Sequence, residues 1–271
     1  MQNVICHQVK QEIQNMVVIG SGNVAWHMIN AFSRKGIKVL QILAHNEKTA
    51  RNLSKAFSIP YILDPALLIK NADLYLVAIQ DDHIREAALG LNLKKQLLVH
   101  TSGFSSIGVL SGASSCTGVL WPLQTLTAGK KVEFSNIPFF VEGQDDETAD
   151  TLANFAGLIS ENVKVTNSPT RQKIHLAAVI ASNLTNQLYS ISASILERQD
   201  IPFSVLAPLI LETAVKAGQQ HPFRSQTGPA VRKDLRVIEK HLELLRGDPD
   251  FRDIYRLITE NIIHHHSLKN E

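Results

Sequence analysis

Short apolar runs alternate with helix-like segments through the first part of the chain. We expect strands at the apolar runs 16–19, 39–44, 74–79 and 96–100, and shorter ones at 117–121, 138–142 and 163–165. Between them, helical spacing of apolar positions predicts helices at 23–35, 49–57, 82–89 and 146–159. Continuous apolar strands that alternate with helices are typical of a mostly parallel sheet with both faces covered. With right-handed crossovers this is a doubly wound α/β fold of the Rossmann type.

The second part of the chain has a different pattern. Helical periodicity covers 169–197, 202–218, 229–245 and 249–268, and no strand pattern interrupts it. A proline lies at or near the start of each segment. Proline lacks an N–H group, and the first N–H groups of a helix form no hydrogen bond within it, so proline is tolerated there. The sequence therefore predicts an α/β domain at residues 1–167, followed by an all-α domain at residues 168–271.

Composition excludes several classes of protein. Hydrophobic residues make up 44% of the chain, charged residues 19%, and the formal net charge is +2. We expect no nucleic-acid partner, because no basic stripe exists, and no membrane span, because no apolar run reaches the necessary length. We expect no metal site either: the two cysteines lack the spacing of zinc ligands, and His264, His265 and His266 would point in different directions on a helix. A cytoplasmic enzyme or binding protein fits best.

The strongest motif is Gly-Ser-Gly-Asn-Val-Ala at residues 20–25, between a predicted strand and a predicted helix. This is the G-x-G-x-x-A form of the dinucleotide fingerprint, in the context that it requires. The first glycine permits a tight turn, the second lets a diphosphate approach the backbone, and the helix start offers free N–H groups. We expect cofactor contacts from Gly20, Ser21, Gly22, Asn23 and Val24. The alternative is a glycine turn in a fold of this type that binds no nucleotide.

The end of the second strand favours NADP over NAD. NAD enzymes usually carry an acidic residue there for the ribose hydroxyls. This chain has His45 and Asn46 at that point, with Lys48 nearby, and uncharged donors beside a cation suit a 2′-phosphate. We therefore expect His45 and Asn46 to contact NADP. Glu47 remains open as an acidic residue that would favour NAD.

Two further strand ends carry polar residues. Ile79 and Gln80 follow one strand, and Thr101 and Ser102 follow His100 at the end of another. In doubly wound sheets this edge borders the cofactor, so these residues are expected cofactor contacts. His100 is a candidate acid/base, because its ordinary pKa is close to neutral pH. The alternatives are a helix cap after Gln80 and a purely structural, hydrogen-bonded His100.

The long helical pattern carries polar residues among apolar ones. His175, Ser182 and Asn186 share a helix face, and Asn183 adjoins it. We name His175 and Asn183 as catalytic candidates. They are eight residues apart, about 12 Å along a helix, so one small reacting group cannot touch both. Amides in such positions also often satisfy a loop.

Several stretches together resemble one bacterial family. They are GSGNVAWH at 20–27, VHTSG at 99–103, WPLQTLT at 121–127, IPFFVEG at 137–143, HLAAVIASNLTNQLY at 175–189 and QTGPAVRKD at 226–234. The chain is similar to Rossmann-like NADP oxidoreductases of the deazaflavin-coenzyme-dependent type with a C-terminal half of unknown function.

This resemblance implies an architecture shared with 6-phosphogluconate dehydrogenase and pyrroline-5-carboxylate reductase. In such relatives the helical domain commonly forms a homodimer interface and supplies substrate contacts. Two features depart from the relatives. His45 stands where the wider family often has arginine, and Lys173 is followed four residues later by Ala177, so the Lys-x-x-x-Asn pair of β-hydroxyacid dehydrogenases is missing.

The leading hypothesis is an NADP-dependent oxidoreductase that transfers hydride to or from a small, anionic substrate, as a homodimer through the C-terminal helices. One alternative is a non-catalytic NADP(H)-binding regulator or scaffold dimer, and another is electron transfer between a deazaflavin and NADP. The surroundings of His175 discriminate between catalysis and regulation. A packed His175 with a backbone partner favours the regulator, and an accessible one favours the enzyme.

Overall fold

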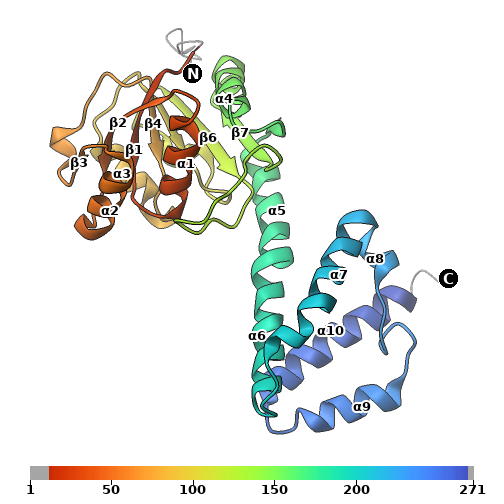
Figure 1. The fold of residues 1–271 in the computed structure, drawn as a ribbon. Coiled ribbons are helices and arrows are strands. Elements are labelled where there is room, and N and C mark those ends of the chain that lie inside the picture. Colours follow the sequence, from red (N-terminus) through yellow and green to blue (C-terminus); the bar gives the residue numbers. More distant parts are fainter. Residues whose placement is uncertain (1–11, 268–271) are drawn as a thin grey trace. The chain divides into compact units, whose positions relative to one another are not determined.

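The computed structural model of the chain describes residues 12–267 (Figure 1). Its first part contains one eight-stranded sheet with the order β3-β2-β1-β4-β5-β6-β7-β8. The strands are β1 (Asn15–Ile19), β2 (Lys38–Leu43), β3 (Tyr61–Ile62), β4 (Leu74–Val77), β5 (Leu97–His100), β6 (Cys116–Pro122), β7 (Phe139–Gly143) and β8 (Val163–Val165). All neighbours pair in parallel except β6 and β7. The first six strands have the order of a dinucleotide-binding Rossmann fold, which confirms the predicted fold class.

Helices cover both faces of this sheet. They are α1 (Asn23–Ser33), α2 (Glu47–Phe57), α3 (Ile84–Gly90) and α4 (Asp146–Gly157), with short 3-10 turns η1 (Pro65–Leu67), η2 (Asp81–His83) and η3 (Ile107–Leu110). One core cluster joins the sheet to α1, α2 and α4, and here Phe32 stacks on Phe155 with ring centroids 4.0 Å apart. A second cluster joins the opposite face to α3 and η3. The strands read as continuous apolar runs because both faces are buried.

The rest of the described chain is helical, as predicted. It contains α5 (Ser168–Val179), the π-helical turn η4 (Ile180–Leu184), α6 (Thr185–Glu197), η5 (Phe203–Leu206), α7 (Ala207–Gln219), α8 (Pro222–Ser225), α9 (Leu235–Leu244) and α10 (Pro249–Ser267). The predicted end of the last helix, Leu268, lies outside the described residues.

The predicted helix 229–245 is wrong in its first part. Residues 229–233 form turns, because Lys233 has the left-handed φ of +54°, which ends any helical path there. α9 begins only after Asp234, whose carboxylate accepts a hydrogen bond from the N–H of Val237. The proline at 229 therefore marks a turn, and the helix cap is an aspartate that lies five residues later.

Internal contacts divide the chain between Ala181 and Ser182, inside the π-helical turn, rather than near Asn167. The first unit keeps α5 because the start of this helix is hydrogen-bonded to the sheet, as described below. None of the helices in the described residues has the length and hydrophobicity that a membrane span requires. In the same residues, no cluster of three or more His, Cys, Asp or Glu side chains is placed to hold a metal ion.

Candidate functional site

The fingerprint turn has the backbone that a bound diphosphate requires. Gly20 has φ of +118°, and a Cβ there would lie 2.1 Å from the carbonyl oxygen of Ala78. Only glycine fits, because both the backbone angle and the neighbouring chain exclude a side chain. A Cβ on Gly22 would meet nothing within 4 Å, so the space outside this residue is open. Ala25 is fully buried against the sheet, as its small side chain predicts.

The start of α1 is free to bind an anion. Gly22 is its N-cap and gives no side-chain hydrogen bond, and the first turn contains no acidic residue. The first N–H groups of this helix therefore lack the partner that a capping side chain supplies. Asn23 and Val24 are the first residues of the helix, so the structure places their backbone N–H groups at this end.

A pocket of about 710 Å³ opens beside the fingerprint turn, at the carboxyl ends of β1, β2 and β4. It brings together four of the predicted cofactor residues, namely Gly20, His45, Ile79 and Gln80. Its other walls are mainly apolar and are formed by Ile19, Leu43, Ala44, Leu63, Pro65, Ala87 and Leu91, with His83, Glu86 and Gly90. An apolar slot with a few polar groups at its rim suits a purine ring and its ribose.

Asn46 is partly committed to the fold. Its side-chain oxygen accepts a hydrogen bond from the N–H of Thr49 and caps α2. Thr49, which sequence analysis missed, also lies 2.6 Å from Ser21 through their hydroxyl oxygens. Because the Thr49 hydroxyl donates to the Asn46 carbonyl, Ser21 is the donor in this pair. A hydroxyl pair thus links the fingerprint turn to the first turn of α2.

The carboxylate of Glu47 is paired with a cation on its own helix. Its carboxylate lies 2.5 Å from the guanidinium of Arg51, one helical turn further along α2. It is also absent from the residues that line the pocket, whereas His45 is among them.

Thr101 and Ser102 do not fit the expected cofactor contacts, because both are nearly buried and hydrogen-bonded within the protein. The Ser102 hydroxyl donates to Asp81 at 2.6 Å and accepts from the N–H groups of Phe104 and Ser105. The Thr101 hydroxyl points to the carbonyl of Val77. Their hydroxyls shape the loop after β5, and their hydrogen-bonding capacity is largely used there. Gln80 rather than Asp81 is the N-cap of η2, and its side chain gives no capping bond.

His100 is also unsuited to touch a substrate. It is fully buried, and its Nδ1 accepts a hydrogen bond from the N–H of Ser102 at 3.1 Å. The pKa of His100 is lowered to about 3, mainly by burial and also by the nearby positive charge of Arg171, whereas a hydrogen bond with the backbone of Ser106 acts in the opposite direction. The imidazole is therefore uncharged near neutral pH, and the structural alternative fits this residue better than the catalytic one.

His175 has different surroundings. It lies on α5, is partly exposed, and its ring is 5.7 Å from the Trp121 ring and 6.1 Å from the Phe104 ring. A Cβ on Gly103 would lie 2.7 Å from His175 Nδ1 and 2.5 Å from Trp121, so the glycine allows this close packing. Within the described residues His175 makes no hydrogen bond, which leaves its ring nitrogens available. Asn183 belongs to the second unit, where it is exposed in the π-helical turn.

A buried ion pair, which no sequence pattern predicted, fixes the helix turn before His175. Arg171, one turn before His175, is fully buried and pairs with Glu142 on β7. The same guanidinium donates to the carbonyl of Ser105, and Glu142 accepts from both the N–H and the hydroxyl of Ser168. The available signal was a lone glutamate at the end of the apolar run in IPFFVEG. The pair joins α5 to β7 and to the loop that carries Gly103 and Phe104.

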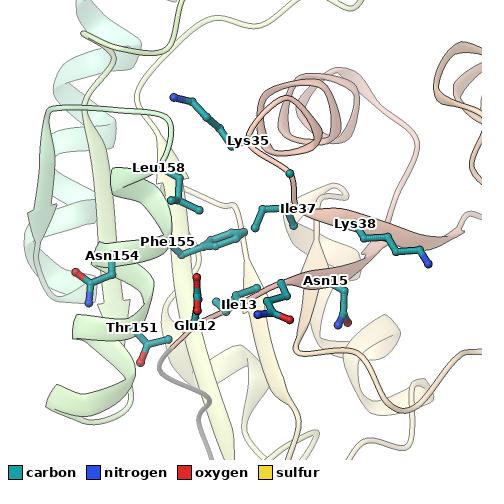
Figure 2. A pocket seen from close by; sticks show the side chains of 12 residues that line it. Glu12, Ile13, Asn15, Lys35, Ile37, Lys38, Thr151, Asn154, Phe155 and Leu158 are labelled. Carbon is teal, nitrogen blue, oxygen red and sulfur yellow. The ribbon is translucent and has the colours of Figure 1, made fainter.

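A second pocket, of about 590 Å³, opens at the opposite edge of the sheet (Figure 2). Asn15 and Lys38, the first residues of β1 and β2, line it together with Phe155 and Leu158. No residue of the fingerprint turn lines this pocket. Ligands of doubly wound sheets bind at the carboxyl ends of the strands, so this pocket is not the candidate cofactor site.

Comparison with known proteins gives two family matches. Residues 15–102 match the family described as "NADP oxidoreductase coenzyme F420-dependent", and residues 137–262 match a domain of unknown function, DUF2520. No curated protein sequence matches the chain.

Solved structures give full-length similarities. A "putative NADP oxidoreductase", BF3122 from Bacteroides fragilis, is 36% identical, with a TM-score of 0.88 over 94% of this chain and 100% of the other. Protein TM1727 from Thermotoga maritima is 23% identical, with a TM-score of 0.73 over the same shares. A reductive aminase from Aspergillus terreus in complex with NADPH is 10% identical, with a TM-score of 0.71 over 94% of this chain and 95% of the other. The last two show a shared fold.

Proposed function

This chain belongs to the NADP oxidoreductase family that contains BF3122, and we propose that it binds NADP(H) at the fingerprint edge of its sheet and transfers hydride to or from a small substrate beside His175. The observation that carries this proposal is the pocket at the carboxyl ends of the strands. It joins the fingerprint glycine to His45 and Gln80, next to the uncapped start of α1.

The residues at the end of β2 and the start of α2 support the choice of NADP over NAD. A 2′-phosphate is bound by hydrogen-bond donors and cations, and an acidic ribose acceptor at the end of β2 would repel it. His45 lines the pocket, the Ser21–Thr49 hydroxyl pair lies at the start of α2, and Glu47 is paired with Arg51. We therefore assign the 2′-phosphate to His45 and the first turn of α2, with Asn46 contributing its amide nitrogen.

The nicotinamide supplies the hydride chemistry when it is bound, and the chain supplies position and the coupled proton. We assign the proton to His175, because its ring nitrogens have no partner among the described residues and it is partly exposed. Trp121, Phe104 and Gly103 hold the ring in place. His100 keeps the loop after β5 in shape and takes no direct part.

The expectation of an anionic substrate draws no support from the first unit. An anion beside His175 would need a free cation, and Arg171 is buried and paired with Glu142. We therefore propose a small substrate without assigning its charge.

Activity tests this proposal. The purified protein is incubated with NADPH and a panel of small carbonyl compounds, imines and a deazaflavin acceptor, and nicotinamide oxidation is followed by absorbance. With any substrate that reacts, His175→Asn is expected to lower kcat roughly a hundredfold with little change in NADPH affinity. Lys173→Ala is the control, because this exposed lysine lies two residues away on the same helix. Tight NADPH binding without turnover of any compound would favour the non-catalytic regulator instead.

We also propose that the second unit mediates a homodimer. Leu184, Leu188 and Ile195 follow one another at helical spacing along η4 and α6 and are 38–55% exposed, and Leu211 and Val215 on α7 are 66% and 51% exposed. Apolar rows of this extent are typical of surfaces that another chain covers. Sedimentation velocity is expected to give a dimer for the native chain and a monomer for Leu211→Glu. A monomeric native chain would contradict this proposal but would not contradict the proposed binding of NADP(H).

A further inference from the structure

The loop between β6 and β7 is fastened to α1. The N–H of Ala128 donates to the side-chain oxygen of Asn23 at 3.1 Å, and Nε2 of His27 lies 2.8 Å from the carbonyl of Thr127. Because a carbonyl only accepts, His27 carries its proton on Nε2. Leu126 and Val132, on the two sides of these contacts, pack against the core cluster that contains α1. The loop is thus held at the end of α1 that carries the fingerprint.

A tight turn projects from this anchored loop. The N–H of Lys130 donates to the carbonyl of Thr127 at 3.2 Å, and Gly129 has φ of +81°. Asn23, to which the turn is bonded, is the first residue of α1, directly after Gly22. The turn Thr127–Lys130 therefore borders the open space above Gly22, where the family fold places the diphosphate of a dinucleotide.

Two adjacent lysines in this loop differ in their partners. The ammonium of Lys131 lies 2.9 Å from the carboxylate of Glu133. Lys130 is exposed, and no residue in the described part of the chain forms an ion pair or a side-chain hydrogen bond with it. A lysine is a compact charge on a flexible four-carbon stem, so it can reach a phosphate from a neighbouring turn. Lys130 is thus an uncommitted cation beside a helix end that has no capping side chain.

We propose that Lys130 binds the diphosphate of the nicotinamide dinucleotide, so that the turn Thr127–Lys130 forms the second wall of the cofactor site opposite the fingerprint. This inference rests on the proposed binding of NADP(H) and adds a contact from the part of the chain that follows β6. The diphosphate is common to NADP and NAD, so Lys130 adds affinity for both and does not select between them.

Binding of two cofactor fragments tests this inference. ADP-ribose carries the diphosphate and lacks the 2′-phosphate, whereas adenosine 2′-monophosphate carries a 2′-phosphate and lacks the diphosphate. Lys130→Ala is expected to lower the affinity for NADPH and for ADP-ribose about five- to tenfold, as for one charge-assisted contact at a partly solvated site. The affinity for adenosine 2′-monophosphate should stay unchanged. Lys130→Arg is expected to keep most of the affinity, and Lys131→Ala is the matched control with native affinity for all three ligands.

The variants also separate the failure of this inference from the failure of the proposed function. Native protein that binds neither NADPH nor the fragments would contradict both the proposed function and the role of Lys130. Native protein that binds NADPH, with Lys130→Ala and Lys131→Ala equal to it for ADP-ribose, would overturn the role of Lys130 alone. Equal weakening of all three ligands by Lys130→Ala would also overturn it, because the loop would then act through the fold and not through the diphosphate.

Discussion

His100 and His175 stand at the same edge of the sheet in different environments. His100 is fully buried and its ring is held by the N–H of Ser102, whereas His175 is partly exposed and its ring packs between aromatic side chains. Both histidines lie next to polar residues in the sequence, so both are catalytic candidates at that level. Burial separates them, because a residue that solvent cannot reach does not meet a substrate.

The uncharged state of His100 predicts how stability depends on pH. Its pKa is about 3 in the folded chain and about 6.5 for a solvent-exposed imidazole, so below pH 6.5 the unfolded chain binds a proton that the folded chain does not. Stability is therefore expected to fall as the pH drops from about 6.5 towards 3, with this residue contributing on the order of 2 kcal/mol of that loss at pH 5. Urea denaturation at pH 8 and pH 5 checks this. His100→Gln should lose less stability between the two pH values than the native chain, and an equal loss would contradict the assignment.

Gly103 predicts a second effect at the residue scale. In Gly103→Ala the new Cβ would lie 2.5 Å from Trp121 and 2.7 Å from His175, so both rings must shift. We expect a changed tryptophan emission spectrum and at least a roughly tenfold loss of turnover, because the proton donor is displaced. NADPH affinity should stay nearly native.

Gly157→Ala is the matched control for that change. A Cβ there meets nothing within 4 Å, and the residue ends α4, where alanine is favourable. Native emission and native turnover in Gly103→Ala would show that His175 does not depend on this packing.

At the scale of elements, α5 depends on one buried ion pair. Arg171→Leu removes the partner of Glu142, which is 8% exposed, and leaves a carboxylate without its cation. Breaking a buried pair from one side costs about 3–5 kcal/mol, and removing both charges costs less. Urea denaturation is therefore expected to show a larger loss for Arg171→Leu than for the double variant Arg171→Leu/Glu142→Leu. A single variant within about 1 kcal/mol of the native chain would mean that the pair does not hold α5 in place.

Strands and the fingerprint were predictable from the sequence because they depend on local patterns. Apolar runs mark strands that are buried on both faces, and the glycines at 20 and 22 mark a turn that other residues do not fit. The Arg171–Glu142 pair depends on a contact between residues 29 positions apart, which is set by the register of the sheet. The contacts of Ser21 with Thr49 and of Asn23 with Ala128 also join residues far apart in the sequence, so no local pattern predicts them. Hydroxyls such as that of Ser102 look like ligands in a sequence until the fold shows that backbone groups already use them.

At the scale of the whole molecule, the first unit by itself contains all parts of the candidate cofactor site. The pocket at the ends of β1, β2 and β4, the open start of α1, and His175 beside Trp121 all belong to residues before Ser182. The proposed preference for NADP over NAD rests on the end of β2, where His45 lines the pocket at the point at which NAD enzymes usually carry an acidic residue. The central claim is that this site binds NADP(H), since the proposed function and the role of Lys130 both depend on a bound dinucleotide.

Titration of the purified chain with NADPH and with NADH, followed by nicotinamide fluorescence, tests this claim most directly. We expect NADPH to bind roughly tenfold or more tightly than NADH, because the 2′-phosphate gains at least one charge-assisted contact at His45 and the start of α2. Equal affinity would contradict the assignment of the 2′-phosphate. Binding of neither cofactor at millimolar concentration would show that the fingerprint turn serves the fold alone, and the proposed function would fall with it.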